Sequence, residues 1–425
     1  MKKIKAAVAG VIAAVMVSAA PAQAAAVQFG TPAAVATDNI QGWPKGPATV
    51  SETAVLMDAE TGAVLYDKGM NERRYPASIT KIMTVLTAIE NSSPEDSVTF
   101  TETGVRDVTW DSTNIGMKLG ETITMKDCWY AAIIKSANEV CAQMAEHIGG
   151  TEAQFIEMMN QKAEEVGCKN THFANASGLP DPNHYTTAYD MAKIMRAGLR
   201  NSTFRKVIGT VNYKIPATSL SDARVMHTHM PLGAKESNLY YEGCLGGKTG
   251  NTNDSGHTLV TAAKRDGRTY IAVTLRTSDL GANCTDSIAL FDYAFNNFES
   301  LNVNGKNITV PKGVTVNDLT VETKDKNDKI MNQYYYNGQW LGYVLTPKNT
   351  PTPAAVQNEE PAAAVEAGQA SETNTQKITE ESEEEEGLSD MSKILLGIMA
   401  VMAVILVILM AALHFKEKKM YRSRR

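Results

Sequence analysis

The sequence predicts an α+β fold in which one antiparallel sheet, assembled from both ends of a domain, is covered by helices. Two apolar runs of strand character, at 53–58 and 63–66, flank a short turn and predict a hairpin. A second pair of such runs, at 258–263 and 269–275, flanks a turn at Asp266-Gly267. The chain between the two hairpins has helical periodicity. The sheet is therefore expected to close only when the second hairpin forms.

The segments between the hairpins place apolar residues at helical spacing. Pro76 precedes the first of them, and proline is favoured at the start of a helix. The predicted helices cover about 78–89, 124–148 with an interruption near Ser136, 152–166 and 189–199, and a further helix follows the second hairpin at about 287–298.

The N-terminus has the layout of a secretory signal peptide. Residues 1–24 open with lysines, continue through an apolar run and end on Ala22-Gln23-Ala24, the order of a signal peptide and its cleavage site. Cleavage after Ala24 or Ala25 fits equally well. The rest of the chain is therefore expected to work outside the cytoplasm.

The C-terminus has the layout of a membrane anchor. Residues 391–413 predict a transmembrane helix, because the apolar run 394–413 is long enough to cross the bilayer core. The basic tail 414–425 follows, and the positive-inside rule assigns it to the cytoplasm. Before the span, 350–390 is rich in Pro, Ala, Thr and Glu and predicts a disordered acidic linker. We expect a single-pass protein of the cell membrane whose main domain lies outside the cell.

The remaining chain divides into a main domain at 45–298 and a small β module at 299–349. Alternating β-type runs such as Trp340-Leu341-Gly342-Tyr343-Val344-Leu345 predict the module. The formal net charge of the chain is −6, and no basic face indicates a nucleic-acid partner.

Five cysteines have no metal-type spacing. In an exported protein they allow two disulfides and one thiol, or five free thiols, and spacing does not decide the pairing. They are Cys128, Cys141, Cys168, Cys244 and Cys284.

A serine and a lysine three residues apart, Ser78 and Lys81, stand at the predicted start of the first helix. Three residues is close to one helical turn, so both side chains share a face. A lysine kept neutral by burial can take the serine proton, and the unpaired N–H groups of a helix start can stabilise an oxyanion. The pattern suits acyl transfer. The alternative is a capping serine beside a solvated lysine.

A second motif, Lys248-Thr249-Gly250, precedes the second hairpin. The lysine offers a fixed positive charge, the threonine a hydroxyl donor, and the glycine allows a ligand to approach the backbone. Together they suit a terminal carboxylate. The alternative is an ordinary Gly-rich turn.

A third motif, Ser-x-Asn, occurs at 112–114, 136–138 and 300–302. We choose Ser136 and Asn138, because two polar residues that interrupt an apolar helical segment need a reason to be buried. A polar junction between two helices is the alternative, and Ser112 remains a rival.

With these three motifs in order, the chain resembles the low-molecular-mass penicillin-binding proteins, which are D-alanyl-D-alanine carboxypeptidases. The resemblance extends over roughly 47–298 and implies the transpeptidase fold that this family shares with β-lactamases. The similar stretches are 75–84, 136–139, 173–179, 184–192 and 247–250.

The resemblance implies a catalytic role for three residues. Ser78 would attack the carbonyl of the penultimate D-alanine, Lys81 would accept its proton, and Ser136 would relay a proton to the leaving D-alanine. The covalent acyl-enzyme would then be hydrolysed by water.

The resemblance also implies the binding groups. Asn138 would bind the substrate amide, Lys248 and Thr249 the terminal carboxylate beside Gly250, and the backbone N–H groups of Ser78 and Asn251 would form the oxyanion hole. The expected partners are the peptidoglycan pentapeptide as substrate, β-lactams as covalent inhibitors and the cell membrane. No cofactor or metal is expected.

The chain departs from the family pattern near the expected site, and also in its shorter β module and in an apolar span where the family more often has an amphipathic anchoring helix. Glu139 stands where the family often has aspartate, and His227-Thr228-His229 stands where asparagines are expected. The alternatives to a carboxypeptidase are a β-lactamase or a D,D-endopeptidase on the same fold, or a non-catalytic cell-wall-binding protein.

Overall fold

The computed structural model describes residues 32–109 and 112–348. The predicted signal peptide, acidic linker, transmembrane helix and basic tail lie outside these residues. Within them, no helix has the length and apolar character that crossing a membrane requires.

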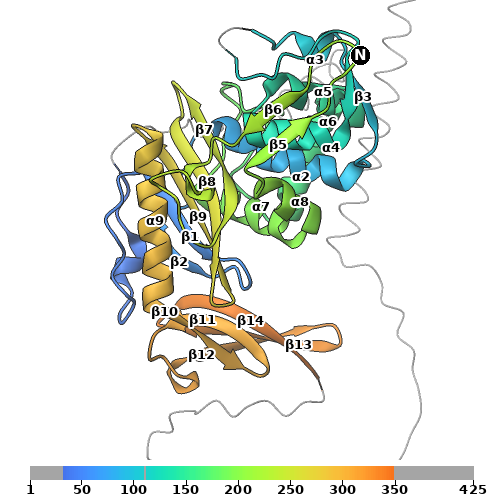
Figure 1. Ribbon diagram of the computed structural model, residues 1–425. Coiled ribbons are helices and arrows are strands. Elements are labelled where there is room, and N and C mark those ends of the chain that lie inside the picture. The colour runs from blue at the N-terminus through green and yellow to red at the C-terminus, as the bar shows by residue number, and fades with distance from the viewer. Residues whose placement is uncertain (1–31, 110–111, 349–425) are drawn as a thin grey trace, which may run out of the picture. The chain divides into compact units, whose positions relative to one another are not determined.

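The centre of the fold is a five-stranded antiparallel sheet with the order β2-β1-β9-β8-β7 (Figure 1). The first strand of the domain, β1, thus lies between its hairpin partner and a strand from the far end of the domain. This order confirms the predicted assembly of the sheet from both ends. The strands are β1 (Thr53–Asp58), β2 (Val64–Lys68), β7 (Cys244–Thr252), β8 (Gly256–Arg265) and β9 (Arg268–Thr277).

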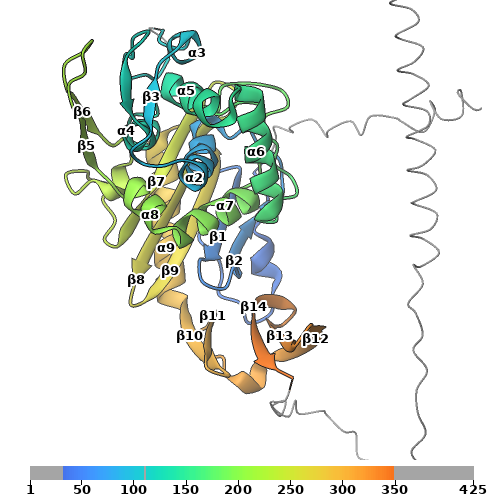
Figure 2. The same ribbon diagram turned by 90° about the vertical axis from the view of Figure 1, so that its right-hand side faces the viewer.

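Helices cover both faces of this sheet, as the two views together show (Figures 1 and 2). Along β1, Val55 and Met57 belong to one hydrophobic cluster and Ala54 and Leu56 to the other, because successive side chains of a strand alternate between faces. The strand is therefore apolar throughout. The cluster with Ala54 packs on α9 (Leu280–Asn297), and the other packs on α2 (Lys81–Asn91), α7 (Ala188–Arg200) and α8 (Ser202–Ile208).

The last helix of the domain begins earlier than the sequence predicted, at Leu280 rather than near 287. Asp279 caps it by accepting a hydrogen bond of 2.9 Å from the backbone N–H of Ala282. Asn283 is buried in its first turn, and its amide donates to β9. Tertiary contacts thus support a turn that helix propensity alone does not favour.

The rest of the main domain is an α-helical region with two small hairpins. The hairpin of β5 and β6 was not predicted from the sequence. The elements are β3 (Ser97–Thr99), α3 (Glu102–Val105), β4 (Thr122–Thr124), α4 (Met125–Tyr130), a π-helical turn (Ala131–Lys135), α5 (Asn138–Gly149), α6 (Glu152–Glu165), β5 (Asn212–Ile215) and β6 (Arg224–His227).

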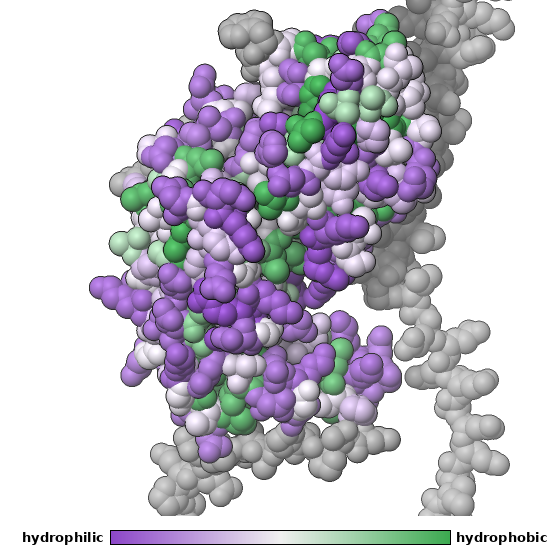
Figure 3. All heavy atoms as spheres, viewed as in Figure 1, coloured by the Kyte–Doolittle hydropathy of each residue, from purple (hydrophilic) through white to green (hydrophobic). Residues whose placement is uncertain are grey.

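After the main domain, the chain forms two small antiparallel sheets, one of two strands and one of three. They lie at the lower end of the view in Figure 1, and the same end of the space-filling view is largely hydrophilic (Figure 3). The boundary between 45–298 and 299–349 stays a prediction. The strands are β10 (Phe298–Val303), β11 (Lys306–Pro311), β12 (Thr320–Lys326), β13 (Lys329–Tyr336) and β14 (Gln339–Pro347).

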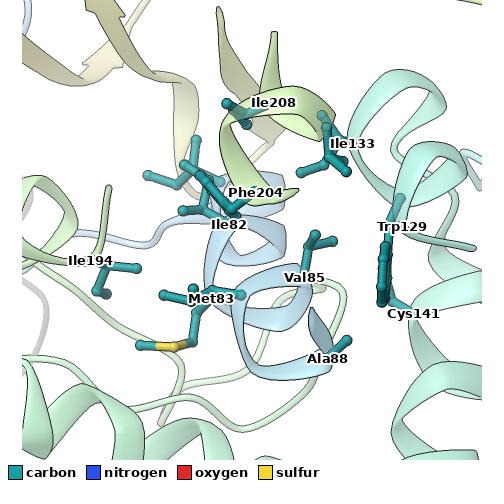
Figure 4. Packing of buried hydrophobic residues seen from close by; sticks show 14 of the residues in the cluster. Ile82, Met83, Val85, Ala88, Trp129, Ile133, Cys141, Ile194, Phe204 and Ile208 are labelled. Atoms are coloured by element: carbon teal, nitrogen blue, oxygen red, sulfur yellow. The ribbon is translucent and has the colours of Figure 1, made fainter. Parts of the chain in front are cut away.

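Helix α2 lies at the centre of the larger hydrophobic cluster, surrounded by side chains from several other helices (Figure 4). Ile82, Met83 and Val85 are completely buried there. Trp129 of α4 and Phe204 of α8 pack into the same cluster. The helix that follows Ser78 is thereby held rigidly, which fixes the position of the serine.

Candidate active site

Ser78 lies in a 3₁₀ helix (Ala77–Thr80) that leads directly into α2, and Lys81 is the first residue of α2. Lys81 Nζ is 3.0 Å from Ser78 Oγ. The prediction that the two side chains share a face is therefore confirmed, although the serine stands in a 3₁₀ turn and not in the α-helix itself.

Lys81 is completely buried, and burial lowers the pKa of its amine. Nζ also lies 2.7 Å from Asn138 Oδ1 and 2.6 Å from the backbone carbonyl oxygen of Ser177. With the amine neutral, its two N–H groups can donate to these oxygens, which leaves the lone pair for the Ser78 hydroxyl proton. The side chain is therefore arranged as a base for Ser78.

The Lys-Thr-Gly motif lies on β7, against the backbone of the serine. A Cβ on Gly250 would stand 2.9 Å from the Ser78 backbone nitrogen and 2.5 Å from Thr258 Oγ1. Only glycine permits this close approach. The lysine of the motif is therefore held on a strand that runs directly beside Ser78.

Lys248 is buried, and its Nζ donates to the Thr249 backbone carbonyl at 2.7 Å. Burial lowers the pKa of Lys248 well below its ordinary value, and the neighbouring positive charge of Lys81 lowers it further. The two amines are therefore close enough to repel each other when both are charged. A substrate carboxylate would relieve that repulsion.

The third motif begins where a helix is interrupted, as predicted. The π-helical turn ends at Ser136, which has a left-handed conformation with φ +58°, and α5 begins at Asn138. The Asn138 side chain is bonded to Lys81. The Ser136 hydroxyl is buried and has no hydrogen-bond partner among the residues that the structure describes.

Ser112, the rival to Ser136, also contacts the Asn138 side chain, through the amide nitrogen and not the oxygen that Lys81 contacts. Asn138 Nδ2 donates to Ser112 Oγ at 3.0 Å, and the Asn138 backbone N–H donates to the Thr113 carbonyl at 2.8 Å. Glu139 holds the same loop by accepting a 2.7 Å hydrogen bond from the Ile115 N–H. Burial raises the pKa of Glu139 to about 7. The loop before α4 is thus fixed to the start of α5.

A loop that the sequence analysis quoted without a role, Asn175 to Leu179, supplies the Ser177 carbonyl to Lys81. Asn175 Oδ1 accepts hydrogen bonds from the backbone N–H groups of Ser177, Gly178 and Leu179. Gly178 has φ +88°, and a Cβ there would stand 2.0 Å from the carbonyl oxygen of Ala77. The glycine thereby allows the loop to pack on the serine backbone.

His184 is a second functional neighbour that the sequence analysis missed. The Ala174 N–H donates to His184 Nδ1 at 3.0 Å, so the ring proton is on Nε2, which donates to Thr80 Oγ1 at 2.7 Å. The Thr80 hydroxyl in turn donates to the Ala77 carbonyl at 2.8 Å. Burial lowers the pKa of His184 to about 3. The neutral ring thus supports the turn that carries Ser78.

A cavity of about 630 Å³ opens beside Ser78. Of the predicted site residues, Ser78, Asn138 and Asn251 line it, whereas the other predicted residues do not. Thr249 is half-buried on β7. Further lining residues are Asp107, Ser112, Gly178, Leu179 and Thr252.

The structure shows the state of the five cysteines and the surroundings of His227 and His229. All five cysteines are free thiols. His227 Nδ1 lies 2.6 Å from Asn212 Oδ1, whereas the pKa of His229 is lowered by burial and by the charges of Lys135 and Lys248.

Residues 41–279 match the sequence family Peptidase_S11, described as D-alanyl-D-alanine carboxypeptidase. The chain belongs to this family. The resemblance stated from the motifs is therefore confirmed: the protein is a serine-type D-alanyl-D-alanine carboxypeptidase of the low-molecular-mass penicillin-binding group.

Individual relatives agree with the family assignment. D-alanyl-D-alanine carboxypeptidase DacF of Bacillus subtilis is 33% identical over 267 residues, which are 62% of this chain and 66% of that protein. The match thus spans slightly less than two thirds of that relative. The crystal structure of the Streptomyces K15 DD-transpeptidase is 27% identical with a TM-score of 0.55, covering 60% of this chain and 100% of that one.

Penicillin binding protein 6B from Escherichia coli supports the fold. Its structure has a TM-score of 0.60 at 24% identity and covers 73% of this chain and 99% of that chain. The α+β fold with its antiparallel sheet is thus shared with solved structures of penicillin-binding proteins.

Proposed function

We propose that this carboxypeptidase removes the terminal D-alanine from peptidoglycan stem peptides through an acyl-enzyme on Ser78. The observation that carries the proposal is the amine of Lys81, buried, with a lowered pKa, 3.0 Å from the Ser78 hydroxyl. A serine is a weak nucleophile without such a base.

In the first step, Ser78 Oγ attacks the carbonyl carbon of the penultimate D-alanine while Lys81 takes the hydroxyl proton. The negative charge moves to the substrate oxygen, where the backbone N–H groups of Ser78 and Asn251 stabilise it. The close packing of β7 on Ser78 supports this pairing of donors.

In the second step, the bond to the terminal D-alanine breaks, and its nitrogen receives, through Ser136, the proton that Lys81 took from Ser78. Asn138 binds the substrate amide, and Lys248 with Thr249 binds the terminal carboxylate beside Gly250. The burial of Lys248 supports this role, because an anionic ligand would stabilise the ammonium form that burial disfavours.

In the last step, water attacks the ester carbonyl while Lys81 takes a proton from the water. The bond to Ser78 Oγ then breaks, Lys81 returns this proton to Ser78, and the shortened peptide leaves as its carboxylate. A β-lactam would acylate Ser78 in the same way, but the acyl group would be removed slowly. We expect β-lactams to act as covalent inhibitors for this reason.

We also propose that the catalytic domain lies outside the cytoplasm, attached to the cell membrane by a single C-terminal span. The signal-like layout of 1–24, the apolar run 394–413 and the basic tail 414–425 support this topology. Protease treatment of intact cells is expected to degrade the catalytic domain and to leave the tail protected. Degradation of the tail with the catalytic domain intact would contradict the topology.

Serine substitutions test the catalytic assignment. Ser78→Ala is expected to abolish labelling by a fluorescent penicillin and D-alanine release, whereas Ser112→Ala leaves labelling largely intact. Loss of labelling in Ser112→Ala, with Ser136→Ala unaffected, would transfer the middle role to Ser112.

Product analysis separates the alternative activities. Release of D-alanine from a D-alanyl-D-alanine peptide, with slow turnover of benzylpenicillin, is expected. Rapid benzylpenicillin hydrolysis without D-alanine release would indicate a β-lactamase, and cleavage of dimeric muropeptides to monomers would indicate an endopeptidase.

A further inference from the structure

A second cavity, of about 830 Å³, is larger than the one beside Ser78 and shares no lining residue with it. It lies where the β1–β2, β8–β9 and β10–β11 turns meet the ends of α7 and α8. Hydrophilic side chains gather in this band between the main body and the lower β strands in Figure 3. Its lining includes only two carboxylates, Asp58 and Glu60, but six cations: Arg196, Arg200, Arg205, Lys264, Arg268 and Lys306.

None of these six cations forms an ion pair with any residue that the structure describes. Arg196 donates instead to the backbone carbonyls of Ala59 and Glu60, at 2.9 and 2.7 Å. Arg205 donates to the Leu199 carbonyl at 2.6 Å. These bonds orient the guanidinium groups but do not neutralise their charge.

Asp58, the more buried of the two carboxylates, accepts hydrogen bonds from neutral groups and not from the six cations. Asp58 is only 4% exposed. It accepts hydrogen bonds from the backbone N–H and hydroxyl of Thr61 and from the hydroxyl of Thr309, at 2.6, 3.0 and 2.6 Å. The lining therefore keeps an excess of four positive charges.

The cations also destabilise one another. Burial lowers the pKa of Arg196, and the positive charge of Arg200 lowers it further. The two arginines are four residues apart on α7, so their side chains share one face of the helix. An anion bound between them would remove this repulsion.

We propose that this cavity binds a ligand that carries several phosphate groups. The planar guanidinium fork binds phosphate oxygens in pairs, and lysines add point charges. Four arginines and two lysines around one cavity can thus serve more than one phosphate, whereas a single carboxylate would leave most of the charge unpaired. Hydroxyl and amide groups of Thr269, Ser300 and Asn307 add neutral donors. This site is independent of the chemistry at Ser78.

Calorimetric titration of the full-length protein in neutral detergent with sodium tripolyphosphate tests the proposal. Saturable binding of one molecule per chain is expected at low ionic strength, and it should weaken steeply as salt is added. Arg200→Gln with Arg205→Gln is expected to weaken binding by roughly 10-fold or more, because two charge-assisted contacts are lost.

The matched control is Lys326→Gln with Lys329→Gln, which removes the same charge from the exposed turn between β12 and β13. This variant is expected to bind tripolyphosphate as the parent does. Penicillin labelling of both double variants verifies that they are folded. No saturable binding, or an equal loss in the two double variants, would overturn the proposal.

Two further probes identify the source of the phosphate. Competition with tripolyphosphate by a short-chain cardiolipin, which carries two phosphates, but not by the matching phosphatidylcholine, would support a lipid headgroup. Competition by inorganic pyrophosphate alone would support a soluble phosphate ligand. Tighter binding of citrate than of tripolyphosphate would show that the cavity selects carboxylates and would overturn the assignment.

Discussion

Among single residues, Lys81 is decisive, because its burial favours the neutral amine that can act as a base. Among the described residues, the hydrogen-bond partners of Lys81 Nζ are Ser78 Oγ, Asn138 Oδ1 and the Ser177 carbonyl oxygen. The absence of a bonded carboxylate matters, because a carboxylate would stabilise the charged amine. The same burial that destabilises the ammonium therefore prepares Ser78 for attack.

The rate of acylation by penicillin is expected to rise with pH and to level off below 10.5, the ordinary pKa of lysine, because burial lowers the pKa of Lys81. Lys81→Arg is expected to slow acylation by roughly 100-fold or more, since arginine does not lose its proton. Stopped-flow measurement of acylation across pH checks both. A pH-independent rate in the parent protein would contradict the role of Lys81 as base.

His184 makes the stability of the Ser78 turn depend on pH. Its pKa of about 3 in the folded protein lies below the ordinary value of 6.5, so the neutral ring stabilises the fold fully above pH 6.5 and less as pH falls toward 3. Linkage predicts a loss of about 2 kcal/mol at pH 5. Urea unfolding at pH 7 and pH 5 is expected to give a smaller loss for His184→Gln than for the parent protein.

If the parent protein and His184→Gln lost the same free energy of unfolding between pH 7 and pH 5, another group would be responsible for the pH dependence.

A second measurement separates the effect of His184 on the position of Ser78 from its effect on the stability of the fold. At pH 7, His184→Gln is expected to lower the acylation rate constant more than the affinity for penicillin, because the turn that carries Ser78 shifts.

At the scale of elements, three separate parts of the chain meet at Ser78: the turn before α2, the loop Asn175 to Leu179, and β7. Glycine makes both close approaches possible, Gly178 in the loop and Gly250 in the strand. Because each glycine has close contacts with backbone atoms of the Ser78 turn, side-chain movement alone cannot relieve a clash there. The loop is therefore as important to the site as the motifs themselves.

Gly178→Ala is expected to reduce penicillin labelling by roughly 100-fold, because a Cβ would collide with the Ala77 carbonyl. Gly167→Ala is the matched control: its φ is +85°, but nothing lies within 4 Å of the new Cβ. Both variants pay the cost of a left-handed alanine, about 1 kcal/mol. Equal labelling of the two variants would contradict the proposed packing of the loop on Ser78.

The sequence predicted the elements whose pattern is local. Alternation and turn signals identified both hairpins, and periodicity identified α2, α6 and α7, whereas the strands β5 and β6 span only four residues each and were missed. The roles of Ser177 and His184 could not be predicted. Ser177 acts through its backbone carbonyl, which every residue has, and His184 contacts a threonine over a hundred positions earlier in the chain.

At the scale of the whole molecule, one sheet joins the two ends of the main domain and brings Lys248 to Ser78. The strand β1 lies between β2 and β9, so the hairpin before Ser78 and the hairpin after Lys248 are parts of one sheet. The motifs are far apart in sequence, but the domain cannot close without bringing them together. The order of the motifs along the chain thus has a structural cause.

Mass spectrometry of the penicillin-treated protein shows which serine carries the acyl group. After proteolysis, the acyl adduct is expected on the peptide that contains Ser78 and not on the peptides that contain Ser112 or Ser136. An adduct on either of those serines, or no adduct at all in a folded protein, would contradict the account.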